Sequence, residues 1–523
     1  MKNNLLIALF LFLISLSQYS CVSSNKYKRI IVASSGKIES LDPARASTLK
    51  SLQLLSALGD TLYELNSEGE LIPVLASGMP IFSKDKLQIL INLKRNILFH
   101  DETSFNSNAI KFSFDRFKKI GTMNYILGNK IKSIETPSEF KVIINLNKPS
   151  SSVNGLLTSV NLTPISPTFY KSYSDRFLND KFVGTGKYIL KRFSNEIQII
   201  DTNLNYWGDK PDNEGISFIG YSNSSSLFGA LKSRQVDVLL SNSIDDIQRN
   251  ELKSLSTNKE IKEGKSPATE ISFISLRTNT YPFDNFNVRL AIAKSLNREF
   301  ISDKVSYGLR QPSRSIVPPI YKKNKQELWP EYNPLEAKDL LQKEGYCDGT
   351  FLDFPLTYRS NVPADKLIAL TWQEQIKSVL NECINIQLNG VESTTIYKNL
   401  NLGIYPAVIL DWTGAYSDPE AYLAPLLSCS ELEGENCIKG ESVYSGSFWG
   451  SKRVESLFLE SENLNGKERL AKLIEIETIA SKSIPYIPIW LSSQKAWSQN
   501  QISKPIFNGA GIISMSDLKF INE

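Results

Sequence analysis

The stretch ISFISLRTNTYPFDNFNVRLAIAKSLNR, residues 271–298, places a strand pattern directly before a helix pattern. Residues 271–276 form a short apolar run, which is typical of a buried strand. The mostly apolar positions that follow recur at the spacing of one helix face: Val288, Ala291, Ile292, Ser295 and Leu296. A strand that leads into an amphipathic helix favours an α/β architecture.

The same alternation of strand and helix patterns continues along the chain, without a repeat of 20–50 residues. Apolar or alternating runs predict further strands at 30–33, 87–94, 139–147, 236–240 and 486–490. Helical spacing predicts a further helix at 363–380. We also expect a helix in the capped segment that begins at Asn106, residues 106–118, and a long helix at about 467–483. We also expect a helix to open at Asp42-Pro43, because Asp can cap free amides and Pro fits the first turn.

The N-terminus has the pattern of an export signal. Lys2 precedes an apolar run of 12 residues, Leu5 to Leu16, and a short polar stretch then leads to Cys21. Such a run is too short to span a bilayer, so residues 1–20 are predicted to be a signal peptide rather than a membrane anchor or a buried helix. Cys21 stands where bacterial lipoproteins carry their lipidated cysteine, although Gln18 replaces the usual Leu. We therefore predict a periplasmic, membrane-anchored lipoprotein with a linker at 21–27.

The other four cysteines fit this oxidising compartment, because they can form two disulfides. We expect Cys429 to pair with Cys437 across a short loop, and Cys347 to pair with Cys383.

Composition speaks against several functional classes. The 59 basic and 55 acidic residues give a net charge of +4, and there is no basic stripe for nucleic acid. His100 is the single histidine, and four methionines are present, so a His-based triad, a zinc cluster or another metal or cofactor site is not expected. Gly184-Thr185-Gly186-Lys187 lacks the spacing of a phosphate loop. Binding is therefore favoured over catalysis, and an exported hydrolase with a carboxylate pair stays as an alternative.

Ordered motifs across the chain from about Ile30 point to one family. They are SLDPA (40–44), TLYE (61–64), PVLA (73–76), FHDET (99–103), VGTGKY (183–188), NYWGDKP (205–211), PFD (282–284), VRLA (288–291) and PLEAK (334–338). Taken together, the sequence resembles the peptide/nickel-type solute-binding proteins of ABC importers, family 5, the dipeptide- and oligopeptide-binding protein group.

This resemblance implies a bilobal periplasmic-binding-protein fold (type II) with an extra domain in the first lobe. Domain I is expected at 28–62, 181–272 and 490–523, domain II at 63–180, and domain III at 273–489. A monomer of this kind closes its hinge on a peptide-sized or smaller solute and delivers it to an ABC permease in the membrane. A binding-only sensor or envelope chaperone on the same fold is the alternative.

The segment 411–419 resembles the ligand loop of the family. Relatives carry an Asp three residues after Trp412, and that Asp binds the α-amine of a peptide, whereas this chain has Ala415. A buried ammonium without its acid loses about 2–5 kcal/mol. Asp418 either substitutes for the missing acid or caps a helix, and the cap is favoured. Trp412 and Tyr416 either line the cleft or pack beneath the loop.

Two further positions are predicted to contact the ligand. Tyr63 is expected to face the cleft. Arg277 stands where relatives usually have Asn, and the resemblance places it near the hinge, where it either clamps a carboxylate or phosphate or forms an internal salt bridge. Ala415 and Arg277 together predict an anionic or neutral ligand rather than an amine-anchored peptide.

Overall fold

The computed structural model describes residues 29–46, 48–124, 127, 130–150, 152–194, 196–240, 244–322 and 327–521. The predicted signal peptide, the lipidation site Cys21 and the linker at 21–27 lie outside these residues. Within the described ranges, each helix is too short or too polar to cross a membrane.

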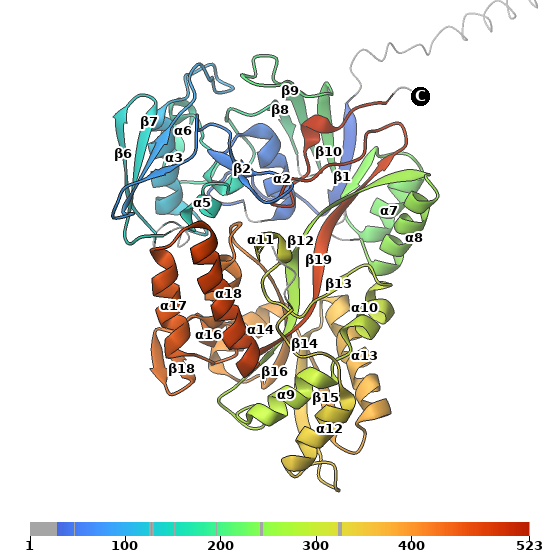
Figure 1. Cartoon of the computed structure of the whole chain (residues 1–523). Coiled ribbons are helices and arrows are strands. Elements are labelled where there is room, and N and C mark those ends of the chain that lie inside the picture. Colours follow the sequence, from blue (N-terminus) through green and yellow to red (C-terminus); the bar gives the residue numbers. More distant parts are fainter. Residues whose placement is uncertain are drawn as a thin grey trace, which may run out of the picture.

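One mixed sheet runs through both halves of the molecule (Figure 1). In spatial order its strands are β15 (Ile384–Val391), β14 (Leu352–Arg359), β16 (Ala407–Thr413), β12 (Ile261–Leu276), β19 (Tyr486–Gln499), β11 (Val238–Leu240), β1 (Ile30–Ser35), β10 (Gly215–Tyr221), β9 (Ile197–Thr202) and β8 (Tyr188–Phe193), with β13 (Gln311–Pro312) paired to β19. We call the half with β1 and β8–β11 lobe I and the half with β14–β16 lobe II.

Strands β12 and β19 cross from one lobe to the other (Figure 1). They pair antiparallel from Ile261 opposite Gln499 to Ser275 opposite Tyr486. At about 3.3 Å per residue, β12 is about 50 Å long, so it contributes to both lobes. Register shifts between Lys265 and Glu270 interrupt the ladder, and such irregularities bend a strand. The predicted domain borders at 272 and 490 fall inside these two strands, and the division into three domains stays a prediction.

Lobe I packs helices against parallel strands. β1 runs parallel to both β10 and β11. Helix α2 (Leu49–Leu58) follows β1, and α7 (Ser224–Lys232) and α8 (Asp246–Thr257) flank β11 in sequence. Buried side chains of β1 and α2, among them Val32 and Leu54, share one core, which confirms the strand predicted at 30–33.

Residues 63–180, which we call the insert, form a separate layer of lobe I (Figure 1). Its sheet has the order β4 (Ile81–Phe82), β5 (Gln88–Asn92), β7 (Lys141–Leu146) and β6 (Ile131–Ser138), beside the hairpin of β2 (Tyr63–Leu65) and β3 (Leu71–Pro73). Helix α3 (Ser107–Ile120) begins after Asn106, whose side chain accepts a hydrogen bond from the amide of Asn108. The strands predicted at 87–94 and 139–147 and the helix at 106–118 are confirmed.

The sheet of lobe II has a buried core on each face, and alternate residues of its strands point into one core or the other. One core lies under α9 (Phe286–Ser295), α10 (Arg298–Ser306), α12 (Pro334–Lys343) and α13 (Pro363–Val379). The other lies under α15 (Glu420–Leu427), α17 (Lys452–Glu462) and α18 (Gly466–Ser483). The helices predicted at 363–380 and 467–483 are confirmed, and the pattern at 287–298 becomes α9 and the start of α10.

The helix predicted to open at Asp42-Pro43 is wrong. Asp42 accepts a hydrogen bond from the amide of Ala44, and its carboxylate binds the guanidinium of Arg116 at 2.8 and 2.6 Å. The helix begins only at Leu49, and Thr48 is its cap. The carboxylate of Asp42 therefore joins lobe I to helix α3 of the insert instead of capping a helix.

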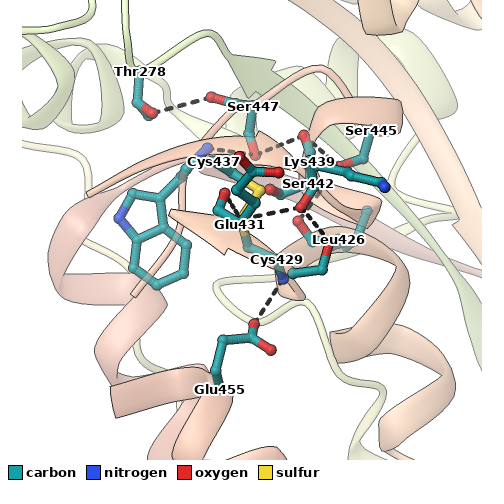
Figure 2. The surroundings of a disulfide bond; sticks show 12 residues. Thr278, Leu426, Cys429, Glu431, Cys437, Lys439, Ser442, Ser445, Ser447 and Glu455 are labelled. Carbon is teal, nitrogen blue, oxygen red and sulfur yellow. Dashed lines mark hydrogen bonds between the residues drawn. A yellow bond between two sulfur atoms is a disulfide. The ribbon is translucent and has the colours of Figure 1, made fainter. Parts of the chain in front are cut away.

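Both predicted disulfides are confirmed. Cys347 pairs with Cys383, and Cys429 pairs with Cys437. The second bond closes the hairpin of β17 (Glu431–Glu433) and β18 (Asn436–Lys439) in lobe II. Glu455 of α17 accepts a hydrogen bond from the amide of Cys429 at 2.7 Å, so the disulfide is also held to a neighbouring helix. This contact is drawn in Figure 2.

Candidate functional site

A loop of lobe II lies against the insert of lobe I. Residues 411–420, which we call the inter-lobe loop, run from the end of β16 to the first turn of α15. β16 pairs with β12 so that Trp412 lies opposite Ile271 and Thr413 opposite Glu270. The backbone of Gly155 in α5 (Val153–Leu156) approaches this loop so closely that a Cβ there would lie 2.7 Å from the carbonyl oxygen of Ser417. The loop therefore forms a direct contact between the lobes.

Every acidic side chain of the inter-lobe loop is paired with a cation. Asp411 binds Arg359 through two hydrogen bonds of 2.8 Å. Asp418 binds Arg469 through two more of 2.8 Å, and its Oδ1 also accepts from the amide of Glu420 at 2.9 Å. The predicted capping contact of Asp418 is thus present, together with an ion pair that the sequence did not suggest.

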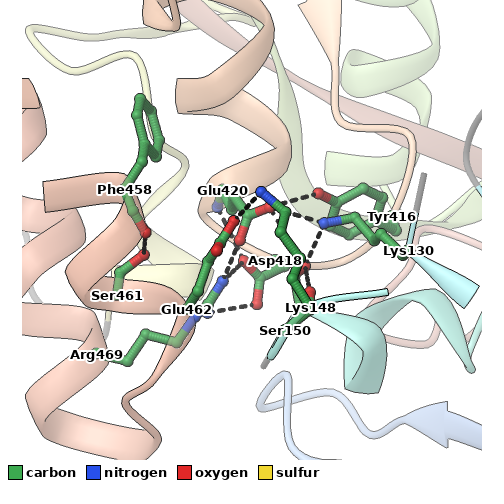
Figure 3. A network of polar contacts seen from close by, with 11 residues as sticks. Lys130, Lys148, Ser150, Tyr416, Asp418, Glu420, Phe458, Ser461, Glu462 and Arg469 are labelled. Atoms are coloured by element: carbon green, nitrogen blue, oxygen red, sulfur yellow. Dashed lines mark hydrogen bonds and ion pairs between the residues drawn. The ribbon is translucent and has the colours of Figure 1, made fainter. Parts of the chain in front are cut away.

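Glu420 is shared between the two lobes (Figure 3). One carboxylate oxygen accepts a hydrogen bond of 2.8 Å from Arg469 in lobe II. The other lies 2.9 Å from the Nζ atom of Lys130 in the insert. Lys130 also donates to the Oγ of Ser152 at 2.8 Å, and its ammonium lies 5.5 Å from the ring centroid of Tyr416. A second ion pair, Lys148 with Glu462, joins the insert to α17.

The electrostatics of this contact keep Glu420 ionised. Burial alone would raise the pKa of Glu420, but the charges of Lys130 and Arg469 outweigh burial and hold the pKa at about 2. Burial raises the pKa of Tyr416 well above its usual value, and the carboxylates of Glu420 and Asp418 raise that pKa further. At neutral pH the loop therefore carries a charged, compensated carboxylate beside a neutral phenol.

The predicted ligand residues of the loop differ in exposure. Ala415 is exposed and Tyr416 is partly buried beside Lys130. Trp412 is partly buried, donates its Nε1 hydrogen to the carbonyl of Ala421 at 2.8 Å, and packs against the core of lobe II. The structure thus brings Trp412, Tyr416 and Asp418 together at the lobe boundary, and their contact with a ligand stays a prediction.

The predicted position of Arg277 near the hinge is wrong. Arg277 follows the last residue of β12, and Leu276 lies opposite Ala407, whereas Ile271 lies opposite Trp412. Six residues at about 3.3 Å each separate Arg277 from the lobe boundary by about 20 Å. Its Nε donates to Asn279 at 2.9 Å, its Nη1 donates to the carbonyl of Gly403, and its guanidinium lies over the ring of Phe448. These contacts are structural, and they do not form the expected salt bridge either.

Tyr63 is placed inside the insert rather than at the loop. Its side chain is fully buried, and its hydroxyl donates to the carbonyl of Gly78 at 3.0 Å. Asp60, three residues earlier, accepts hydrogen bonds from Thr185, Tyr206 and Trp207 at 2.9, 3.0 and 3.0 Å. The VGTGKY and NYWGDKP motifs therefore meet at Asp60 within lobe I, where Lys187, Tyr206 and Trp207 also line a cavity of about 590 Å³.

A cavity of about 270 Å³ opens at the carboxyl end of β1 and the start of α2. Open α/β sheets bind ligands beyond the carboxyl ends of their strands. Arg45 and Glu39 bring both signs of charge to the wall, and hydroxyls complete it: Ser40, Thr48, Ser51 and Thr122. Asn161 donates to the carbonyls of Pro43 and Ala46 at 2.8 and 2.7 Å, which fixes this wall to the part of the insert that carries α5.

Sequence reasoning missed Lys130, Glu420 and Arg469. Lys130 and Glu420 are 290 positions apart, and Arg469 lies 49 positions after Glu420. Long-range pairs of this kind leave no local pattern. Only the sequence DPE at 418–420 hinted that carboxylates gather at a helix start.

The chain matches a known class of protein. The chain matches the family described as "Bacterial extracellular solute-binding proteins, family 5 Middle" over residues 70–434. The chain therefore belongs to family 5 of the bacterial extracellular solute-binding proteins.

Curated relatives match over most of their length. The chain is 24% identical over 449 residues to heme-binding protein A of Haemophilus influenzae, covering 80% of this chain and 78% of that protein. It is 24% identical over 472 residues to the glutathione-binding protein GsiB of Salmonella choleraesuis, covering 88% of each. It is 24% identical over 507 residues to di/tripeptide-binding protein 3 of Pseudomonas aeruginosa, covering 90% of each. These relatives are all named as binding proteins.

Solved structures confirm the predicted bilobal fold. HbpA2 from Haemophilus parasuis superposes with a TM-score of 0.82 at 21% identity, covering 95% of this chain and 100% of that one. NikA from Brucella suis in complex with Fe(III)-EDTA also gives 0.82, at 19% identity, covering 94% and 100%. The chain has the type II periplasmic-binding-protein fold.

Proposed function

We propose that this chain is the solute-binding component of an ABC importer, which holds a peptide-sized or smaller solute between its lobes without transforming it. The observation that supports this proposal most is the inter-lobe loop, which lies against the insert where β12 and β19 pass between the lobes. A solute that touches both lobes favours the closed form through its higher affinity for that form, and a permease can then recognise the loaded protein. Export, a lipid anchor on Cys21 and a monomeric state belong to the same proposal.

The proposed solute is not anchored by a free ammonium group at the inter-lobe loop. Ala415 offers no carboxylate, and Asp411, Asp418 and Glu420 are each bound by a cation of the protein. Arg277 no longer supports an anionic ligand, because it lies far from the lobe boundary. A neutral or anionic group is therefore proposed to face the loop.

Native mass spectrometry of the purified protein tests the solute class, because a tightly held solute survives purification. The expected result is a bound solute without a free amine, released on denaturation. A co-purified short peptide with a free α-amine would refute the proposed class. Thermal unfolding in the presence of peptides, their N-acetylated forms, sugars and organic anions extends the test, since a solute that binds only the folded protein raises its Tm.

Solution scattering tests capture itself. The protein is first freed of solute by mild denaturation and refolding. Addition of the solute identified above is then expected to reduce its radius of gyration. If none of the retained or screened compounds reduced the radius of gyration, the result would contradict a binding protein that closes its hinge on a solute.

A further inference from the structure

The ammonium of Lys130 has partners on three sides. An alkylammonium carries three N–H donors, and here one faces the Glu420 carboxylate at 2.9 Å and another the Ser152 hydroxyl at 2.8 Å. The ring of Tyr416 lies at 5.5 Å on a further side, within the range of a cation–π contact. A carboxylate, a hydroxyl and an aromatic face are the groups that recognise a primary ammonium.

The charges of this cluster balance only with Lys130 in place. Asp418 and Glu420 supply two negative charges, and Arg469 and Lys130 supply two positive ones. Arg469 already binds both carboxylates, so removal of Lys130 leaves one uncompensated negative charge. The side chains of Lys130 and Glu420 are only 18% and 14% exposed, so water replaces the lost partner poorly.

The two halves of this cluster come from different lobes. Lys130 belongs to the insert, whereas Tyr416, Glu420 and Arg469 belong to lobe II (Figure 3). Ser152, which accepts from Lys130, also belongs to the insert. The ammonium can therefore reach the carboxylate only when the lobes are together.

We infer that Glu420, Ser152 and Tyr416 form a primary-ammonium site that the protein fills itself with Lys130, so that the lysine latches the lobes and denies the site to an ammonium group of the solute. This inference rests on the proposed function, because it concerns the lobe boundary where the solute is held. Lys130 is then a specificity-determining residue, which restricts this end of the solute to groups without a primary ammonium.

Chemical rescue tests the site without any knowledge of the solute. The Lys130→Ala variant removes the tethered ammonium and leaves its partners. We expect a Tm lower by about 2–4 °C. We also expect a larger mean radius of gyration at neutral pH, because the latch keeps part of the solute-free molecules closed and the variant loses this part. Ethylammonium chloride is then expected to restore both quantities with a saturable dependence on concentration. Tetramethylammonium chloride at equal ionic strength lacks N–H donors and is expected to have no such effect.

Lys148→Ala is the matched control, because Lys148 also pairs across the lobes with Glu462 but its side chain is 56% exposed. Ethylammonium is expected to change neither this variant nor the wild type beyond the effect of tetramethylammonium. Lys130→Gln serves as a second test variant if Lys130→Ala does not fold. It is expected to show the same loss, and a smaller rescue because the glutamine side chain partly fills the site.

Two results would overturn the inference. One is an unchanged Tm and radius of gyration in both Lys130 variants. The other is a loss that ethylammonium does not restore, or restores equally in Lys148→Ala. Failure of the proposed function is distinguishable, because it would appear as the absence of any solute that compacts the protein, whereas the rescue uses no solute.

Discussion

Arg469 of α18 binds the two carboxylate oxygens of Asp418 through its Nη1 and Nη2 atoms, each at 2.8 Å. Its Nη2 atom also donates to a carboxylate oxygen of Glu420 at 2.8 Å. The side chains of Arg469 and Asp418 are 8% and 12% exposed. One guanidinium therefore holds the inter-lobe loop in place from within lobe II. Both partners of this contact belong to lobe II, so the contact does not depend on the insert, and the same Glu420 side chain also binds Lys130.

Arg469→Met is expected to destabilise the protein strongly. Removal of one partner from a buried ion pair leaves an uncompensated charge, which costs about 3–5 kcal/mol. Urea unfolding followed by far-ultraviolet circular dichroism measures this change as a lower midpoint. Arg453→Met is the control, because Arg453 contacts Glu460 and Glu475 at the surface and is expected to leave the midpoint unchanged. Equal midpoints for the two variants would contradict the anchoring role of Arg469.

The sequence predicted correctly those structural features in which the interacting residues are close together in the chain. The cap at Asn106 was readable because its acceptor and donor lie two residues apart. The helix at Asp42 failed because that carboxylate is used by Arg116, 74 positions away. Arg277 was misplaced because a single sequence gives neither the length of β12 nor which end of that strand meets the other lobe. The pair of Lys130 and Glu420 could not be predicted either, because the two residues are 290 positions apart.

The two disulfides are expected to stabilise the protein unequally. In the loop-entropy description, cross-links 36 and 8 positions apart contribute about 4 and about 2.5 kcal/mol respectively. The double variants Cys347→Ala/Cys383→Ala and Cys429→Ala/Cys437→Ala are therefore expected to unfold at lower urea concentrations, with the larger shift for the first. The reduced wild-type protein provides the sum for comparison. A larger shift for the pair at 429 and 437 would indicate that local packing around the β17–β18 hairpin outweighs loop entropy.

His100 makes the stability depend on pH near neutrality. Its Nε2 lies 3.1 Å from the carbonyl of Gly186, so Nε2 carries the proton, and burial lowers the pKa of the imidazole below its usual value. The histidine of the unfolded chain has a pKa of about 6.5. Between that pKa and the lower pKa of the folded chain, the unfolded chain therefore binds a proton at His100 that the folded chain does not bind. The contribution is fully present above that pKa and is lost as pH falls through it toward the folded pKa.

The free energy of unfolding is therefore expected to decline between about pH 7.5 and pH 5.5. Urea titrations across this window measure the slope. His100→Gln is expected to flatten the slope, since His100 is the single histidine of the chain. An identical slope in the variant would assign the pH dependence to other groups.

Gly155 lies at the contact between the lobes, where an added methyl group would meet lobe II. An added Cβ would lie 2.7 Å from the carbonyl oxygen of Ser417 and 3.3 Å from the Cβ of Asp418, and both atoms belong to lobe II. A shift of the inter-lobe loop away from the added methyl group would be unfavourable, because Arg469 binds Asp418 and holds the loop in place. Gly155→Ala is therefore expected to leave each lobe intact but to prevent full closure. Overpacking of this kind costs about 1–3 kcal/mol, so solute affinity is expected to fall by a factor of about 5 to about 150.

Solution scattering with and without solute measures the closure, and calorimetry measures the affinity. Gly229→Ala in α7 is the matched control, because a Cβ there meets nothing within 4 Å. That control is expected to close and to bind like the wild type. If Gly155→Ala also compacts fully with solute, the contact between α5 and the inter-lobe loop is not part of the closed state, and the lobe boundary must form elsewhere along β12 and β19.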